Sequence, residues 1–374
     1  MKKNTIALRG QKAISKRAKK SIRKSSHARL TAGLDLGDRT SRYCILDGAG
    51  EVASEGSVAT TKTGLSAVFG NMAPMRIALE VGTHSPWVSR HLAALGHEVI
   101  VANTHKLKLI TQSTRKNDRN DAERLARLAR VDPKLLSPIR HRGAQAQADL
   151  AVIRARAAMV RARTELINAA RGLVKPMGER LRKCDAGQVD ANLGADLSPA
   201  TLAVVQPILE AIDTITEKIH VYDEQIGKIA KRYPELTLLT QVYGVGILIG
   251  LTYMLTIEDP QRFAHSRDVG PFLGLQPKQR DSGQSQPQLG ISKTGDRLLR
   301  SLLVQGAHCI LRKNAPDSDL RRWGLKKAEG SKRAKRRALV GMARKLAVLL
   351  HRLWVTGEVY EPLHQQAGAK KIAA

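Results

Sequence analysis

Three short runs lie near the start of the chain: Gly33–Gly37, where apolar residues alternate around Asp35, then Arg42–Asp47, which holds a continuous apolar stretch, and Glu51–Val58. The tetrapeptide Asp47-Gly48-Ala49-Gly50 separates the second run from the third. A period of two is typical of strands with one buried face, and Asp-Gly is a strong turn signal. We therefore predict a three-stranded meander of hairpins.

A different pattern follows the meander. Arg76–Val81 and Glu98–Ala102 are short apolar runs, and a helix is expected between them over about Pro86–Leu95. Strand, helix and strand after a meander predict an α/β layered domain. Another helix is expected to begin within Arg115–Ala122 and to run to about Arg130.

From Ala144 onwards apolar residues recur at spacings of three and four, which is typical of helices. Two long helices are expected, Ala144–Val174 and Pro199–Arg232, with a Gly-containing irregular stretch between them. An antiparallel helical hairpin and an intermolecular coiled coil both fit this pattern. In either case the apolar seam is expected to be core or dimer interface.

The remaining residues predict a second, mainly helical domain, so the fold class is α/β followed by α. Helices are expected within Leu238–Leu255 and over Phe263–Leu275, Arg297–Leu311 and Ala338–Trp354. The predicted divisions are a disordered basic arm at 1–30, an α/β domain at 31–143, a helical connector at 144–232, a carboxyl-terminal domain at 233–357 and a tail at 358–374.

Charge gives the first indication of a partner. The 374 residues include 63 Lys and Arg against 33 Asp and Glu, a net charge of +30, and self-repulsion of this size is relieved when a polyanion binds. Aromatic residues make up only 3%, which favours phosphate contacts over base stacking. We therefore expect a nucleic-acid-binding protein. The basic arm would bind phosphate without sequence choice, or be a solvated tail with no specific role.

Cysteine usage and hydropathy exclude other classes. The three cysteines, Cys44, Cys184 and Cys309, are scattered and lack CxxC spacing, so neither a disulfide framework nor a zinc site is expected, and a reducing cytosol fits. No apolar run is long enough to span a membrane, and the basic start lacks the apolar core of a signal peptide. A soluble protein is expected.

Four carboxylates are candidates for a metal site. Asp35 lies within an apolar strand, where a buried carboxylate is costly unless something such as a divalent metal compensates it. Glu80 lies near the carboxyl end of its strand, the edge where open α/β sheets place their sites. Asp118 and Asp121, three apart on a predicted helix, can share a ligand. Two-metal phosphoryl transfer needs such a set of carboxylates. Alternatively, Asp118 caps the helix and Asp121 complements its dipole, and these roles do not exclude metal binding.

A polar loop flanked by cations is the second candidate. Ser282 lies between Arg280 and Lys293, surroundings that an alkoxide attacking a phosphodiester needs; Ser285 and Ser292 compete with it for this role. The alternative is a solvated loop that only contacts phosphate. The side chains expected to contact phosphate are those of Lys278, Arg280 and Lys293. No histidine closely flanks Ser282, so a Ser-His-Asp hydrolase is not expected.

Gly244-Val245-Gly246 precedes an apolar helix. This arrangement resembles a helix-hairpin-helix element, in which backbone amides at the helix start hold a phosphate, so Gly244 and Gly246 are candidate nucleic-acid contacts. Gly-x-Gly turns also occur for purely steric reasons.

The order of these motifs resembles the DEDD transposases of bacterial insertion sequences, the insertion-sequence 110 family. In the first half the resemblance rests on Leu-Asp-Leu-Gly at Asp35, Leu-Glu-Val-Gly-Thr-His at Glu80 and the segment Lys116–Ala122. In the second half it rests on Gly244–Gly246, Asp259–Phe263, Gly274–Pro277, Gly290–Gly295 and Arg300–Leu303. It covers roughly residues 31–311.

The resemblance implies a RuvC-like, ribonuclease-H-like amino-terminal domain, a coiled-coil connector and a smaller transposase domain. On this pattern Asp35, Glu80, Asp118 and Asp121 would bind Mg²⁺. Ser282, the position that matches the family's essential serine, would attack the DNA backbone and form a phosphoserine link. Two departures concern Asn117, where Thr or Ser is usual, and the basic arm, which extends beyond the usual start.

The resemblance also implies partners. The serine and the carboxylates would come from different protomers of a homo-oligomer, a dimer or a tetramer. A structured RNA encoded by the element would guide the enzyme to its DNA, in the bacterial cytoplasm with the nucleoid.

The expected activity is therefore RNA-guided, site-specific DNA recombination that moves an insertion sequence. A RuvC-like junction resolvase or nuclease, in which metal-activated water attacks, is the alternative. Ser282→Ala should abolish the first activity and spare the second. A non-enzymatic basic scaffold is a third reading, in which Asp35→Ala alters only local stability.

Overall fold

The computed structural model describes residues 30–103, 118–280, 282, 285–287 and 289–364; of Asp118 and Arg119 only the backbone is described. The chain forms two compact units, one ending at His141 and the other beginning at Arg142. Each unit has a hydrophobic core of its own. The predicted basic arm lies outside the described residues apart from Leu30. The separation of a connector from a carboxyl-terminal domain stays a prediction.

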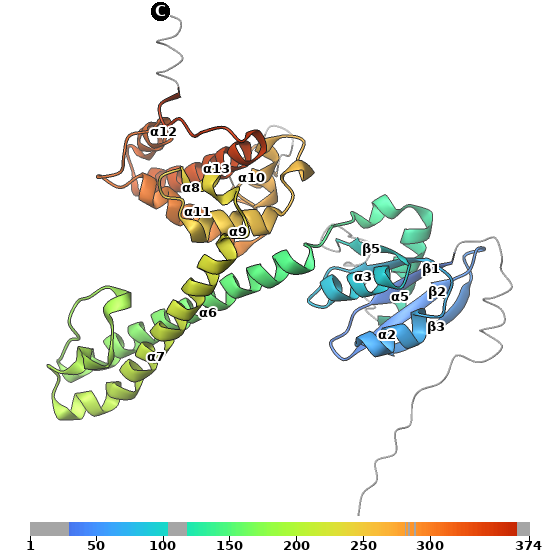
Figure 1. Cartoon of the computed structure of the whole chain (residues 1–374), viewed down its shortest axis with the longest axis horizontal. Helices are drawn as coiled ribbons and strands as arrows, with labels where there is room; N and C mark the ends of the chain where they lie inside the picture. The colour runs from blue at the N-terminus through green and yellow to red at the C-terminus, as the bar shows by residue number, and fades with distance from the viewer. Residues whose placement is uncertain (1–29, 104–117, 281, 283–284, 288, 365–374) are drawn as a thin grey trace, which may run out of the picture. The chain divides into compact units, whose positions relative to one another are not determined.

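A five-stranded mixed sheet forms the centre of the first unit (Figure 1). Its strands are β1 (Thr31–Asp35), β2 (Thr40–Leu46), β3 (Val52–Ala59), β4 (Arg76–Glu80) and β5 (Glu98–Ala102), in the spatial order β3-β2-β1-β4-β5. The first three strands are an antiparallel meander, while β4 and β5 run parallel to β1. The predicted meander and parallel strand are confirmed, and the topology is consistent with a ribonuclease-H-like domain.

Helices cover both faces of this sheet. Successive strand residues face opposite sides. Leu34 belongs to a core cluster with α2 (Lys62–Phe69) and α3 (Ser85–Ala94). Its neighbour Gly33 lies beneath α5 (Asp118–Val131) on the other face. The first unit is therefore a three-layer α/β/α sandwich, in which α5 alone of these helices touches the Gly33 side.

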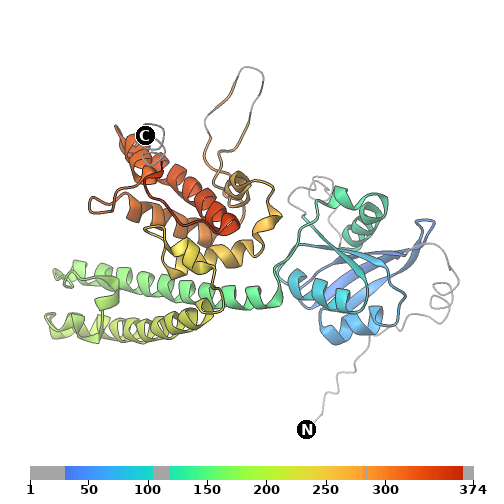
Figure 2. The same ribbon diagram turned by 45° about the horizontal axis from the view of Figure 1, so that its top comes forward.

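The second unit begins with an antiparallel pair of long helices. Helices α6 (Ala144–Val174) and α7 (Pro199–Ala230) lie side by side in both views (Figures 1 and 2). The connection between them holds three short 3-10 helices, Lys175–Met177, Ala186–Gln188 and Ala191–Gly194. The predicted helices are confirmed and form a hairpin within one chain. A coiled coil between chains stays a prediction.

A buried carboxylate ties the two ends of this hairpin together. The side chain of Asp149, on α6, accepts hydrogen bonds from the Tyr233 hydroxyl at 2.7 Å and from Gln145 Nε2 at 2.9 Å, and it pairs with Arg232. Burial raises the pKa of the Asp149 carboxyl, but these donors together lower it below its usual value. Burial and the Asp149 contact raise the pKa of Tyr233 to about 12.

The rest of the second unit packs around an apolar helix, α9. Its helices are α8 (Leu236–Thr240), α9 (Ile247–Ile257), α10 (Val269–Phe272), α11 (Arg297–Ile310), α12 (Asp319–Ala328) and α13 (Lys332–Thr356), with 3-10 turns at Pro260–Arg262 and Ser266–Asp268. All residues of α9 from Gly250 to Ile257 are buried, as expected of a helix that is apolar all round. The Tyr253 hydroxyl donates to the Ala347 carbonyl at 2.6 Å.

Two helix predictions differ from the structure, and two helices of the structure were not expected. A continuous helix over Phe263–Leu275 is wrong, because Pro271 lacks an amide donor and its ring clashes with the preceding turn; only α10 is α-helical there. Helix α13 begins earlier than predicted, because the Ser331 side chain caps it by accepting from the Ala334 amide. Helices α2 and α12 were not predicted. Within the described residues, no helix is long and apolar enough to cross a membrane.

Candidate functional site

Asp35 and Glu80 end two neighbouring parallel strands. In the β1–β4 ladder Leu34 is paired with Leu79, so the two carboxylates are the next residues on their strands. Both side chains are half-buried, and Glu80 continues in register beside Ala102 of β5. The carboxyl edge of the sheet thus brings these two predicted residues side by side along the backbone.

Gly33 allows α5 to lie directly on β1. A Cβ atom at Gly33 would lie 1.9 Å from the Ala122 carbonyl oxygen and 2.6 Å from the Ala126 amide nitrogen, both of them backbone atoms of α5. No side chain fits such a space, so only glycine permits this contact.

The direction of α5 follows from the contacts that arginines in its carboxyl-terminal half make with the sheet. Arg130 Nη1 donates to the Asp47 carbonyl at 3.0 Å, and Arg127 Nη1 donates to the Gly50 carbonyl at 3.3 Å. These carbonyls belong to the turn after β2, which lies at the amino end of β1 because Leu46 is paired with Thr31. The opposite end of α5 therefore points to the carboxyl edge of β1, where Asp35 lies.

Asp118 and Asp121 lie in the first turn of α5, toward that same edge. Asp121 is mostly buried, and its Oδ1 atom lies 3.4 Å from Arg124 Nη1. The Asp118 side chain is outside the described residues. Among the side chains that are described, no three His, Cys, Asp or Glu residues form a group that could hold a metal ion. The structure thus brings the elements that carry the four carboxylates to one edge, without a described cluster of ligands.

Four contacts made by the segment that follows Glu80 were not anticipated from the sequence. His84 Nε2 lies 3.1 Å from Asp38 Oδ1, and the Trp87 indole donates to His84 Nδ1 at 3.1 Å. The buried Ser85 hydroxyl donates to the Gly82 carbonyl at 2.8 Å and lies 2.8 Å from His141 Nε2. These contacts hold the loop after β4. The run Gly82-Thr83-His84-Ser85 was the available signal, since its small polar residues are typical of turn-forming segments.

The described residues of the predicted serine loop, 276–280, 282, 285–287 and 289–292, form two antiparallel arms, called the serine ribbon below, which extend from the second unit in Figure 2. The Ser292 amide donates to the Gln276 carbonyl, and the Lys278 amide donates to the Gly290 carbonyl. Further out, Ser282 and Ser285 exchange two backbone hydrogen bonds of 3.1 and 3.0 Å. Lys278 and Arg280 are exposed on its first strand.

The ribbon distinguishes the three candidate serines only in part. Ser282 and Ser285 form a hydrogen-bonded cross-strand pair, whose side chains lie on the same face, and both residues are exposed. Ser292 lies instead at the base, where its hydroxyl is 3.0 Å from that of Thr294. The geometry fits a structural role for Ser292 and leaves Ser282 and Ser285 as alternatives.

Close backbone packing fixes the base of the ribbon. Gly274 and Gly295 have φ values of +67° and +72°, and a Cβ atom at either would come within 2.3 Å of a backbone oxygen, that of Thr294 or of Phe272. The Lys293 amide donates to the Gly274 carbonyl at 3.2 Å, and Lys293 itself has φ +58°. The glycines of the two motifs thus join the ends of the ribbon.

Two arginines that sequence reasoning missed support this base. Arg300 Nη1 donates to the Leu273 carbonyl at 2.9 Å and to the Thr294 carbonyl at 2.6 Å. Asp296 caps α11 by accepting from the Leu299 amide at 2.9 Å, and it pairs with Arg154 of α6. Burial raises the pKa of the Asp296 carboxyl, but the Leu299 amide and Arg154 together lower it below its usual value. Arg300 belongs to the Arg300–Leu303 motif, but in a chain with 63 Lys and Arg residues the sequence does not show that either arginine has a structural role.

The Gly244-Val245-Gly246 segment connects α8 to α9. Gly244 has φ +86°, and a Cβ atom there would lie 2.8 Å from the Gly306 carbonyl on α11, so this glycine has a steric role. Gly246 caps α9, with open space where a Cβ would be. Phosphate binding by this helix start stays a prediction.

Comparison with known proteins finds related families for both parts of the chain, the α/β domain and the part that carries the serine ribbon. A family model described as a transposase, of the IS110 DEDD type, matches residues 32–177, and the model of the transposase IS116/IS110/IS902 family matches residues 236–321. Together they span more than half of the chain. The first covers β1, β4 and the start of α5, and the second covers the serine ribbon.

Curated relatives extend over most of the chain. The transposase for insertion sequence element IS1111A from Coxiella burnetii is 26% identical over 88% of this chain and 90% of its own length. A probable family 20 transposase from Pseudomonas aeruginosa is 27% identical over 68% of this chain and 77% of its own length. The transposase for IS1328 from Yersinia enterocolitica is 26% identical over 64% of this chain and 72% of its own length.

An α/β domain of the DEDD type followed by a helical transposase domain defines an enzyme that recombines DNA. The chain belongs to the IS110 family of insertion-sequence transposases.

Proposed function

We propose that this transposase moves its element by strand exchange with Ser282 as the nucleophile. The observation that supports it most is the serine ribbon, in which Ser282 is exposed on a narrow hairpin that carries Lys278 and Arg280. The ribbon rises from a base that is held by the Arg300 and Asp296 contacts. A rigid base under an exposed hydroxyl is what positioning of a nucleophile requires.

The proposed step exchanges one phosphoester bond, that of the DNA strand, for another, that of the serine. The Ser282 oxygen forms a bond to the scissile phosphorus while the bond from phosphorus to one strand oxygen breaks. The serine proton leaves, and the departing strand oxygen takes up a proton. Arg280 and Lys293 would stabilise the charge that develops on the phosphate oxygens. A strand hydroxyl attacking the phosphoserine would reverse the step and join the new strand.

The four carboxylates would hold Mg²⁺. Asp35, Glu80, Asp118 and Asp121 offer hard oxygen donors, the ligands that this ion prefers, and their elements converge on one edge of the sheet. When bound, the ion would neutralise charge on the scissile phosphate. The four carboxylates would hold the ion in position.

A trapping assay tests the serine. Purified protein, DNA carrying the element end, Mg²⁺ and the element's non-coding RNA are mixed and run on a denaturing gel. A protein–DNA adduct is expected, and it should vanish in Ser282→Ala and in Asp35→Ala but persist in Ser285→Ala, the matched neighbour on the same face. Adduct loss only in Ser285→Ala would move the role to Ser285. Cleavage without any adduct, unchanged by Ser282→Ala, would favour a metal-dependent nuclease.

Two partners complete the proposal. The excess of positive charge suits a structured guide RNA encoded by the element, and omission of that RNA should abolish adduct formation on target DNA. A homo-oligomer would combine the serine of one protomer with the carboxylates of another, in the bacterial cytoplasm where the nucleoid DNA lies. Mixing Asp35→Ala chains with Ser282→Ala chains should then restore an adduct, carried by the Asp35→Ala chain. No restoration would place both groups on one chain.

A further inference from the structure

The end of α12 and the start of α13 form a strongly basic surface of the second unit. Between Leu320 and Lys345 the sequence has eleven Lys and Arg residues and a single acid, Glu329. Nine of these cations are exposed, and six of them, on the last turn of α12 and the first turns of α13, are considered together: Lys326, Lys327, Lys332, Arg333, Lys335 and Arg336. None of these six takes part in the ion pairs of the described residues. This surface lies beyond the two ranges that the family models match.

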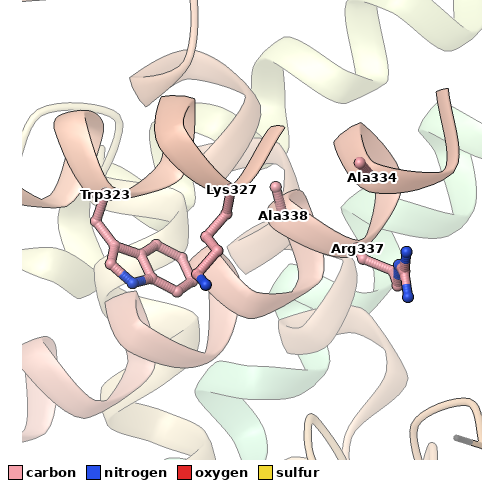
Figure 3. Close-up of a pocket in the computed structure, with 5 residues that line it drawn as sticks. All are labelled: Trp323, Lys327, Ala334, Arg337 and Ala338. Atoms are coloured by element: carbon pink, nitrogen blue, oxygen red, sulfur yellow. The ribbon is translucent and has the colours of Figure 1, made fainter. Parts of the chain in front are cut away.

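A cavity of about 270 Å³ opens within these cations (Figure 3). Trp323 and Lys327 line it from α12, four residues apart and hence on one face of that helix. Ala334, Arg337 and Ala338 line it from α13. In Figure 3 the indole and the Lys327 side chain lie next to each other, and the α13 residues lie on the other side.

The indole ring is held in place by its surroundings. Lys345 Nζ lies 4.8 Å from the ring centroid, a cation–π contact. A Cβ atom at Gly341 would lie 3.1 Å from the far edge of the ring, so the ring packs closely on the α13 backbone. A pre-positioned aromatic ring loses little freedom when a planar ligand stacks on it.

We propose that this surface binds a single strand of nucleic acid, with its phosphates on the exposed cations and one unpaired base in the Trp323 cavity. Cations track a phosphate backbone without regard to sequence, and aromatic rings stack on unpaired bases. A duplex keeps its bases stacked on one another and cannot offer one to a cavity. The low aromatic content of the chain still disfavours an extended stacking platform, and the inference concerns this one ring.

The proposal deepens the proposed function, because both require nucleic acid, but its test needs no chemistry. Binding is measured by fluorescence anisotropy on the full chain carrying Ser282→Ala, which removes the proposed nucleophile. The probes are a labelled oligothymidylate and a labelled duplex of equal length. Strand exchange and this binding can therefore fail independently of each other.

Two variants test the cavity. Trp323→Leu, which keeps an apolar side chain over Gly341, should weaken oligothymidylate binding about 5- to 100-fold and leave duplex binding unchanged. Ala334→Leu, which fills the cavity from α13 and keeps the indole, should cause a comparable loss. Circular dichroism should show unchanged helicity in both. Equal losses for strand and duplex, or no loss in either variant, would overturn the proposal.

A matched pair of variants tests the cations. Replacing Lys332, Arg333, Lys335 and Arg336 with Gln should lower the slope of log affinity against log salt by up to about 3. The control replaces four exposed cations of the α6–α7 hairpin, namely Arg161, Lys218, Lys228 and Lys231, with Gln. The charge loss is the same, but the slope should change by less than half as much. Equal changes in both variants would mean diffuse attraction by net charge and would contradict a local site.

Discussion

Arg154 of α6 donates from Nη2 to Asp296 Oδ2 at 2.8 Å, and the Asp296 side chain is only 8% exposed. Asp296 also caps the amino end of α11 and directly follows the base of the serine ribbon. The pair therefore connects the long helix to the segment that carries the proposed nucleophile. Its charge state is a testable feature of the second unit.

Asp296→Asn should lower the stability of the second unit by about 1 kcal/mol near neutral pH, because asparagine still caps α11 but leaves Arg154 without its charged partner. The pKa of Asp296 is depressed below 3.8 in the folded chain, so its contribution is present above pH 4 and is lost as pH falls through the folded pKa. Thermal unfolding from pH 7 downwards should show the two proteins converging in acid. A difference that grows in acid would contradict this assignment.

Arg300→Met should loosen the serine ribbon. The Leu273 and Thr294 carbonyls lose their donor, which costs about 1–3 kcal/mol, and the ribbon loses part of its fixed base. We expect slower adduct formation together with a lower melting temperature. Arg297→Met, an exposed cation one turn earlier on the same helix, removes the same charge and should change neither property. Equal effects of both variants would show that charge, not anchoring, matters.

Gly33→Ala should prevent α5 from docking on β1. The added Cβ would meet backbone atoms that cannot rotate away, so either the helix or the strand must shift. We expect a loss of at least about 3 kcal/mol, enough to unfold much of the first unit at 37 °C. Circular dichroism and limited proteolysis measure this loss. The comparison variant is Gly82→Ala, where a Cβ would meet open space; a similar loss there would show that the effect is not specific to the contact.

The sequence was sufficient for the strands that carry Asp35 and Glu80. Their alternating or continuous apolar patterns predict strands, and parallel strands place their carboxyl ends at one edge. It was not sufficient for the packing of α5 on β1, which depends on Gly33 lying beneath Ala122, 89 positions away in the chain. Contacts of this range leave no periodic signal.

The serine ribbon also has features that the sequence reveals and others that it does not. The glycines at 274 and 295 and the cations around Ser282 are visible as motifs, and their positions in turns are typical of glycine. The roles of Arg300 and Arg154 are not visible, because one arginine among many is indistinguishable until its partners are known. The choice between Ser282 and Ser285 also remains a prediction, because both face the same side of the ribbon.

Mg²⁺ should stabilise the first unit through its carboxylates. Ligand binding adds RT ln(1 + [L]/Kd), about 1.4 kcal/mol at ten times Kd, and for a unit of this size that raises the melting temperature by roughly 4–7 °C. Asp35→Asn should abolish the shift, since it replaces one of the proposed carboxylate ligands with a neutral amide. Calorimetry with and without EDTA measures the shift in both proteins.

The control for this metal effect is Asp38→Asn. Asp38 is a nearby carboxylate whose side chain is 90% exposed and pairs with His84, and it lies outside the proposed ligand set. Its variant should keep the full Mg²⁺ shift. If Asp35→Asn and the wild type respond equally to Mg²⁺, the ion binds elsewhere on the chain. If Asp38→Asn loses the shift while Asp35→Asn keeps it, the site lies nearer the His84 loop than the β1–β4 edge. Because the readout is melting temperature rather than DNA cleavage, it tests the carboxylate assignment independently of the serine.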